Sequence, residues 1–190
     1  MNLEIPWERY ALIAELVRRS DAQGMTLGKT AFQKMIFLLQ RVFGFDFDYS
    51  YTLYTYGPFC ADVARDLDIV AGFGGVEIAY NGVYGGCELR PGPASDELRE
   101  RGAGILPSVS TALDKLLADY GRATAKELEL RSTIIYLASP ERSGNEVVRL
   151  VQQAKPHFSE GQIEAARREL EEQGYLGGSV NLGGTLAAGN

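Results

Sequence analysis

The sequence predicts an α+β fold that is mostly helical, with a winged-helix-like N-terminal part and a C-terminal helical part. An almost wholly apolar helix runs into an aromatic strand, and a strong β-hairpin signal follows further along the chain. A second helix is expected between that strand and the hairpin, and this order is typical of a winged-helix scaffold whose hairpin is the wing.

The chain length allows one domain, or two small ones that share a core. We assign four regions to the 190 residues. They are a winged-helix-like part, a linker, a C-terminal helical part that shares the core, and a Gly-rich tail, at residues 1–92, 93–106, 107–176 and 177–190.

The N-terminal part is expected to open with two helices. Residues 7–19 carry apolar side chains at helical spacing. A second helix begins at Thr26 or Gly28 and runs to about Phe43, with Gly44 as its stop. Because its apolar side chains cover more than half of its circumference, we expect it at the centre of the core.

Residues 45–56 alternate between aromatic and polar side chains, as a half-buried strand does. The alternation changes phase near Leu53, which a β-bulge would explain. We therefore expect the odd-numbered aromatic residues in the core. Tyr54 and Tyr56 are expected to be half exposed or packed against the C-terminal helices.

A helix and a hairpin should follow this strand. Pro58 suits the first position of a helix that reaches about Val70 and stops at Gly72. Asn81-Gly82 between two β-prone segments predicts a type I′ turn. A two-residue loop would pair Tyr80 with Val83 and Ile78 with Gly85.

The remaining chain is predicted to be helical. A short charged helix is expected at residues 95–101, followed by four helices with apolar stripes. Ser159 and Gln162 have the spacing of a capping box, and Gly174 is expected to stop the helix that they open. Residues 179–182 in the tail are a candidate short strand.

Charge and composition limit the possible partners. The net charge of −6 argues against broad non-specific binding to nucleic acid. Residues 1–45 are nevertheless positive, with six Lys or Arg against four Asp or Glu. If the protein binds nucleic acid, the candidate contacts are Arg18, Arg19, Lys29, Lys34 and Arg41.

The sequence favours a cytoplasmic protein that has no membrane partner. No apolar run approaches the ~20 residues of a membrane helix, and the N-terminal residues do not resemble a signal peptide. Cys60 and Cys87 have no metal-ligand spacing and are expected to be reduced thiols, with Cys60 a buried filler.

The residues that could support catalysis do not form a recognisable set. His157 has no partner motif, so we interpret it as a loop or cap histidine. Two acidic groups, Asp46 with Asp48 and Asp62 with Asp66 and Asp68, are interpreted as hydrated surface charge rather than a metal site. Phosphate-loop and nucleophile-elbow motifs are absent. We therefore expect no catalytic residue, no metal and no cofactor.

The exposed aromatic residues have two functional interpretations. Aromatic side chains on a sheet stack on nucleic-acid bases, and they are also enriched at protein interfaces. We take Tyr54, Tyr56 and Phe59 as candidate partner-binding residues.

Several short motifs together resemble a known family. They are Lys29-x-x-Phe32-Gln33-Lys34, Tyr56-Gly57-Pro58-Phe59, Asp66-Leu67, Glu127-Leu128-Glu129-Leu130, Thr133-Ile134-Ile135-Tyr136-Leu137 and Lys155-Pro156-x-Phe158-Ser159. Over roughly residues 8–176 the chain resembles the YwgA-like proteins and the related Panacea (SocA-like) antitoxin domains. The aromatic Tyr-Gly-Pro-Phe form and the long C-terminal helical part depart from the Panacea pattern.

The resemblance implies a winged-helix-like protein of prokaryotic or phage type. Panacea members neutralise toxins by binding them, and one type is a proteolytic adaptor. We therefore expect a non-enzymatic protein-binding module with a toxin or a protease-linked protein as partner, and a homodimer is left open. The alternatives are a winged-helix DNA-binding transcriptional regulator and, on the acidic clusters alone, a hydrolase or nuclease.

Overall fold

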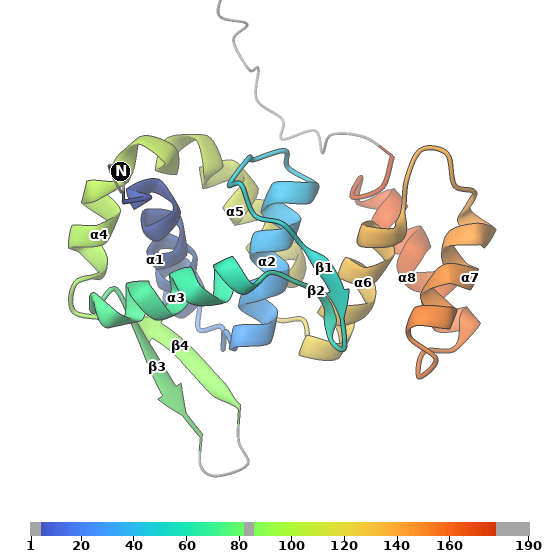
Figure 1. Cartoon of the computed structure of the whole chain (residues 1–190), viewed down its shortest axis with the longest axis horizontal. Helices are drawn as coiled ribbons and strands as arrows, with labels where there is room; N and C mark the ends of the chain where they lie inside the picture. The colour runs from blue at the N-terminus through green and yellow to red at the C-terminus, as the bar shows by residue number, and fades with distance from the viewer. Residues whose placement is uncertain (1–4, 82–85, 178–190) are drawn as a thin grey trace, which may run out of the picture.

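The structure, a computed structural model, describes residues 5–81 and 86–177. It has the predicted fold class, a mostly helical α+β fold (Figure 1). The helices are α1 (Trp7–Ala22), α2 (Lys29–Arg41), α3 (Ala61–Gly72), α4 (Ser95–Arg101), α5 (Leu106–Tyr120), α6 (Ala125–Leu137), α7 (Gly144–Ala154) and α8 (Glu160–Glu172), with a 3₁₀ turn at Ala103–Ile105.

The strands among the described residues form two small antiparallel sheets. We call β1 (Thr52–Tyr54) with β2 (Gly57–Phe59) the aromatic hairpin, and β3 (Val76–Tyr80) with β4 (Cys87–Pro91) the wing hairpin. None of the described helices is long and apolar enough to cross a membrane.

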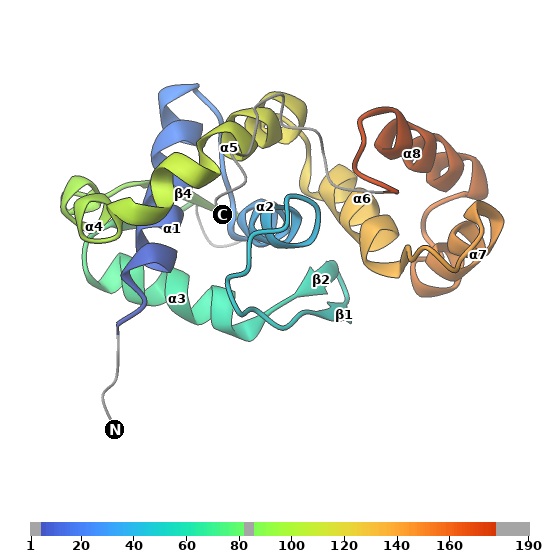
Figure 2. The same cartoon turned by 90° about the horizontal axis from the view of Figure 1, so that it is seen from above.

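Helix α2 lies at the centre of the molecule, as its apolar pattern predicts. Seen from above, it lies among α3, α5, α6 and the aromatic hairpin (Figure 2). Phe32, Ile36 and Leu39 are 0% exposed. A helix buried on this many sides needs apolar residues around most of its circumference, so the composition of α2 determines its place.

The N-terminal part has a winged-helix-like order of elements. Leu27, between α1 and α2, forms a β-bridge with Leu89, and the Leu89 amide donates to the Leu27 carbonyl at 2.8 Å. This bridge adds a third short segment to the wing hairpin, which projects away from the helices in Figure 1. The aromatic hairpin is inserted between α2 and α3.

The predicted long strand at residues 45–56 is wrong, although its predicted inward face is correct. Phe47 and Tyr49 are buried and Asp46 and Asp48 are exposed, but regular pairing begins only at Thr52. The Asp46 carboxylate accepts the amide of Asp48, which has a φ of 57°, and this turn prevents an extended ladder. The phase changes at a tight turn rather than at a bulge, because Tyr54 pairs directly with Gly57.

Pro58 lies in β2 and does not start a helix, so α3 begins three residues later than predicted, at Ala61. Pro58 is opposite Leu53 in the register. Proline has no amide proton to donate, so this pair must be the kind that exchanges no ladder hydrogen bonds.

The predicted register of the wing hairpin is also wrong. Tyr80 pairs with Cys87 and Ile78 with Leu89, so the loop is longer than two residues. The expected partners at positions 83 and 85 lie outside the described residues.

The segment expected to be a linker, residues 93–106, packs against the rest of the fold, and α4 confirms the short helix predicted at residues 95–101. The segment also contains the 3₁₀ turn, and α4 packs along α1. Leu98 is 3% exposed, and a Cβ at Gly102 would collide with the Trp7 backbone. The apolar face of α4 was too short to be recognised as part of the core.

The C-terminal helices follow the prediction closely. The capping box of α8 is present: the Ser159 hydroxyl accepts the Gln162 amide and the Gln162 side chain accepts the Ser159 amide. Gly174 follows α8 with a φ of 79°. The Gly-rich tail is described only at Gly177, so the candidate strand at 179–182 lies outside the described residues.

Candidate protein-binding site

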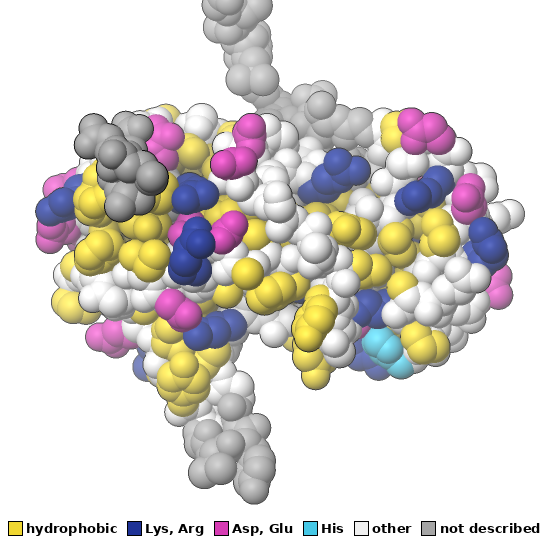
Figure 3. Space-filling model, in the orientation of Figure 1, with side chains coloured by type: hydrophobic (Ala, Val, Ile, Leu, Met, Phe, Trp, Pro, Cys, Tyr) yellow, Lys and Arg dark blue, Asp and Glu magenta, His cyan; other side chains and the backbone are white. Residues whose placement is uncertain are grey.

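The three candidate partner-binding residues lie together on the aromatic hairpin. Tyr54 and Tyr56 are 67% and 64% exposed, and Phe59 is 37% exposed. The Tyr54 and Phe59 rings are tilted against each other with centroids 6.0 Å apart. Hydrophobic side chains are exposed over the lower end of this hairpin in Figure 3. Large aromatic rings exposed as a group are typical of interaction surfaces.

The same three rings line a pocket of about 260 Å³ between the hairpin, α2 and α3. Its other lining residues are Lys29, Thr30, Phe32, Gln33, Lys34, Gly57, Ala64 and Leu67. The pocket is therefore mostly apolar, and its volume is below the ~300 Å³ lower bound for pockets that hold drug-sized ligands. It matches a single large side chain better than a cofactor.

Gly57 allows the hairpin to approach α6 closely. Its φ is +89°, and a Cβ there would lie 3.1 Å from the Ser132 hydroxyl and 3.2 Å from the Thr133 hydroxyl. Both the backbone conformation and the lack of space require glycine.

A buried ion pair in the C-terminal helical part binds the tip of the hairpin. The Lys155 ammonium donates to the carbonyls of Tyr54, at 2.8 Å, and Thr55. It also lies 3.0 Å from the Glu129 carboxylate, and both side chains are less than 10% exposed, at 4% and 7%. His157 Nε2 is 3.4 Å from the same carboxylate oxygen. His157 is thus a neighbour of a structural ion pair.

Two residues of α2 hold the other strand. The Lys34 ammonium donates to the Pro58 carbonyl at 2.7 Å, and the Gln33 amide donates to the Cys60 carbonyl at 2.9 Å. Burial lowers the pKa of Lys34 to about 8, against the opposing effect of the Glu129 carboxylate. These roles were not recognised from the sequence, because the acceptors are backbone groups on a distant segment.

The predicted basic surface does not form one face. Arg18 and Arg19 both donate to the buried Glu15 carboxylate. Lys34 is 2% exposed and cannot contact a surface ligand such as duplex DNA, so this prediction is wrong for Lys34.

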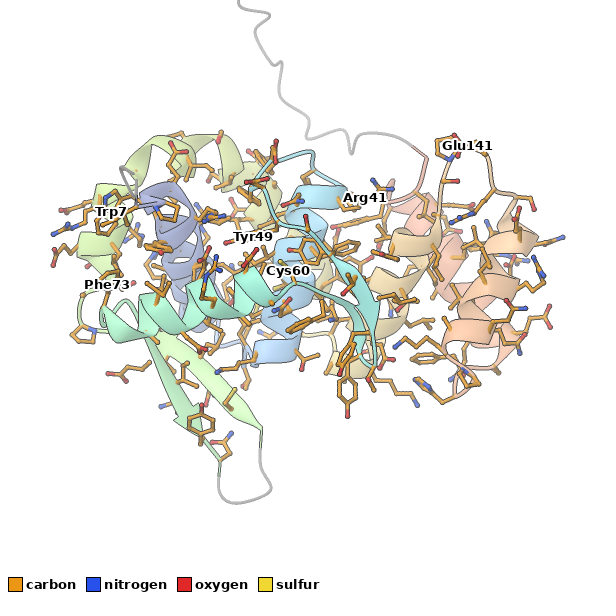
Figure 4. The ribbon with its side chains drawn as sticks, in the orientation of Figure 1. Trp7, Arg41, Tyr49, Cys60, Phe73 and Glu141 are labelled. Atoms are coloured by element: carbon orange, nitrogen blue, oxygen red, sulfur yellow. The ribbon has the colours of Figure 1, made fainter. Side chains whose placement is uncertain are left out.

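The remaining two cations lie at opposite ends of α2. Lys29 lies 3.2 Å from Asp68, and Arg41 is exposed at the other end of the helix (Figure 4). At 1.5 Å per residue, about 18 Å of helix separates them.

Of the acidic residues predicted to be hydrated, Asp46, Asp48 and Asp68 are exposed, but Asp66 is not. Asp66 is 1% exposed rather than hydrated. Its carboxylate accepts the Tyr49 hydroxyl at 2.8 Å and forms an ion pair with Arg9 at 3.3 Å. Asp62 pairs with Arg65 at 2.7 Å. Within residues 5–81 and 86–177, no group of three or more His, Cys, Asp or Glu is arranged to hold a metal ion.

A larger pocket, of about 620 Å³, lies between the C-terminal end of α2 and helices α6 to α8. Arg41, Arg142 and Arg167 line it. Arg167 is already paired with Glu164 at 3.0 Å and with Glu171, and Arg142 donates to the Leu137 carbonyl. The guanidinium groups of Arg142 and Arg167 are thus already bonded to other groups of this protein.

Comparison with known proteins does not assign a role to this site. The chain matches no protein-family model, and a search of curated proteins found no match.

Proposed function

We propose that this protein is a non-enzymatic protein-binding module of the cytoplasm, an antitoxin-like or adaptor-like regulator of prokaryotic or phage type. The observation that carries the proposal is the exposed aromatic hairpin and its pocket, in which Tyr54, Tyr56 and Phe59 surround a space sized for one side chain. Buried aromatic anchors supply much of the binding free energy at protein interfaces. The resemblance to the YwgA-like and Panacea proteins supports the same proposal.

The contacts that hold the hairpin in place support it further. Lys155 and Lys34 fix the two strands of the hairpin through backbone carbonyls, and Gly57 fits closely against α6. A preformed surface loses little conformational entropy when a partner binds.

A DNA-binding regulator is the alternative, and the projecting wing hairpin favours it by analogy alone. Helix α3, which precedes the wing, exposes Asp68 and partly exposes Asp62. These carboxylates would repel a phosphate backbone. The most exposed candidate contacts, Lys29 and Arg41, lie at opposite ends of α2.

The test is capture of partners from native cell lysate with the tagged protein, with and without nuclease. The double variant Tyr54→Ser/Tyr56→Ser is compared with Tyr80→Ser, which removes an equally exposed tyrosine, 71% exposed, from the wing hairpin. We expect one near-stoichiometric protein that survives nuclease, is lost with the double variant and is retained with Tyr80→Ser.

Two results would contradict the proposal. Equal capture by the wild type and the double variant would exclude the aromatic hairpin as the binding surface. Recovery of DNA, or loss of every partner on nuclease treatment, would favour the regulator. Binding to duplex DNA that weakens in Lys29→Glu/Arg41→Glu would then locate the contact.

A further inference from the structure

The pocket beside the aromatic hairpin has an uneven charge. Its walls are aromatic and aliphatic, and its described lining residues include two charged side chains, Lys29 and Lys34, both cationic. Carboxylates are absent from this described lining. In a protein with a net charge of −6, a pocket whose described charged lining residues are all cations is a local exception.

The buried groups behind the pocket add to this positive charge. Lys34 and Lys155 lie close enough to the single carboxylate of Glu129 to interact with it electrostatically. Two ammonium groups against one carboxylate leave a surplus positive charge. Because the cluster is buried, water screens this charge less than it screens a surface charge.

Lys29 is available to a ligand at small cost. Its ammonium is 3.2 Å from Asp68, but the two side chains are 39% and 64% exposed. Exposed ion pairs of this kind contribute little free energy. A carboxylate on a partner can therefore replace or share Asp68 without breaking a buried interaction.

From these observations, and on the basis of the proposed function, we infer the chemistry of the partner segment. We propose that the pocket takes one large apolar side chain of a partner protein, aromatic or branched aliphatic, flanked by an Asp or Glu. The apolar side chain lies against Tyr54, Tyr56 and Phe59, and the carboxylate contacts Lys29. The pocket volume of about 260 Å³ limits the apolar group to a single side chain.

The experiment uses the full chain and three synthetic peptides in Gly/Ser flanks that differ only at the centre: Asp-Trp-Asp, Ser-Trp-Ser and Lys-Trp-Lys. Each peptide is titrated into the protein, and binding is measured from the changes in the amide chemical shifts of the protein. We expect the acidic peptide to bind about tenfold more tightly than the neutral one, and the basic peptide to bind weakest. Higher salt should reduce the difference between the peptides.

Matched variants locate the contact. Lys29→Gln should reduce affinity for the acidic peptide about fivefold and leave the neutral peptide unchanged. Lys126→Gln is the control, because it removes the same charge from an exposed position on α6 that does not line the pocket. The melting temperature of each variant verifies that it is folded.

The results separate this inference from the proposed function. Equal affinity for all three peptides, a preference for the basic peptide, or equal losses in Lys29→Gln and Lys126→Gln would overturn the acidic-flank inference. The proposed function would survive each of these results if capture still depended on Tyr54 and Tyr56. It would be contradicted if that dependence were absent, or if DNA were recovered or every partner were lost on nuclease treatment.

Discussion

Gly57 shows how a single residue positions the site. Its positive φ lets the chain pass from the turn at Thr55 and Tyr56 into β2, and the missing side chain lets the hairpin approach the hydroxyl groups of α6. Tyr54 and Tyr56 precede Gly57 and are exposed, although the backbone at Gly57 lies against α6.

We predict that Gly57→Ala destabilises the protein by about 2 kcal/mol, since an L-residue at this φ is strained and its Cβ is crowded. Gly161→Ala, at a position where a Cβ meets nothing within 4 Å, should instead stabilise α8 slightly, by about 0.5 kcal/mol. Urea unfolding of the two variants measures both effects. Equal stability of Gly57→Ala and the wild type would contradict the role given to Gly57.

Glu15 is a second residue that we expect to have a large effect on stability. It is 3% exposed, and its carboxylate is bound by three arginines. Burial alone would raise the pKa of its carboxyl group, but hydrogen bonds from Arg18 and Arg19, together with the charge of Arg99, lower the pKa to about 2. The carboxylate in the folded protein is therefore harder to protonate than in the unfolded chain.

This pKa predicts how stability depends on pH. The folded state binds fewer protons than the unfolded state between pH 4.5 and about 2, so the contribution of Glu15 is complete above pH 4.5 and is lost as the pH falls. The wild type should lose up to about 3 kcal/mol more than Glu15→Gln on acidification from pH 5 to pH 2. Glu172→Gln, at an exposed position, is the control. Parallel pH curves for wild type and Glu15→Gln would refute the prediction.

At the scale of elements, the aromatic hairpin is held from both sides of the molecule. Lys34 of α2 donates to β2, and Lys155, just after α7, donates to the turn between β1 and β2. A two-stranded hairpin alone is marginal in water. Its order in this protein depends on these two buried cations and on Glu129, which compensates the charge of Lys155.

We predict that Lys155→Met destabilises the protein by about 3 kcal/mol, because it leaves the buried Glu129 carboxylate without its main partner. Adding Glu129→Gln should recover part of this loss, since the unpaired charge is then removed. Hydrogen exchange should show faster exchange at the Gly57 amide in Lys155→Met than in the surface variant Lys126→Met. Strictly additive losses in the double variant would argue against a direct pair.

At the scale of the whole molecule, the winged-helix-like part and the C-terminal helices share one core. Helix α4 packs on α1, α5 packs on α1 and α2, and α6 packs on α2. The rings of Trp7, Tyr10 and Phe73 contact one another and connect α1 with the residue that follows α3. Figure 4 shows Trp7 and Phe73 at one end of the molecule.

A shared core predicts a single cooperative unfolding transition. Trp7 is the only tryptophan of the chain, so its fluorescence reports on α1, whereas far-UV circular dichroism reports on all helices. The two signals should have the same midpoint in urea. Separate midpoints, or proteolytic cleavage within residues 93–106 that releases two folded fragments, would show that this segment is a linker after all.

Local features of the sequence were sufficient for most elements. Helical spacing predicted α1, α2 and the C-terminal helices, and the Ser159 capping box was recognised from two residues. The change of phase in the aromatic segment predicted that Tyr54 and Tyr56 are half exposed or packed on the C-terminal helices, and they are 67% and 64% exposed. These features depend on neighbours within a few residues, so the sequence alone contains them.

The tertiary structure decided which charges face solvent and which face one another. Lys34 and Asp66 are of residue types usually found at the surface, but they are 2% and 1% exposed. A backbone carbonyl accepts a hydrogen bond from Lys34, and the Arg9 and Tyr49 side chains compensate the charge of Asp66. Lys155 reaches a carbonyl 101 residues away in the chain. Hydrophobic periodicity reports which side of an element is buried, but it cannot report which distant group lies opposite, so the pocket and its cations appear only once the chain is folded.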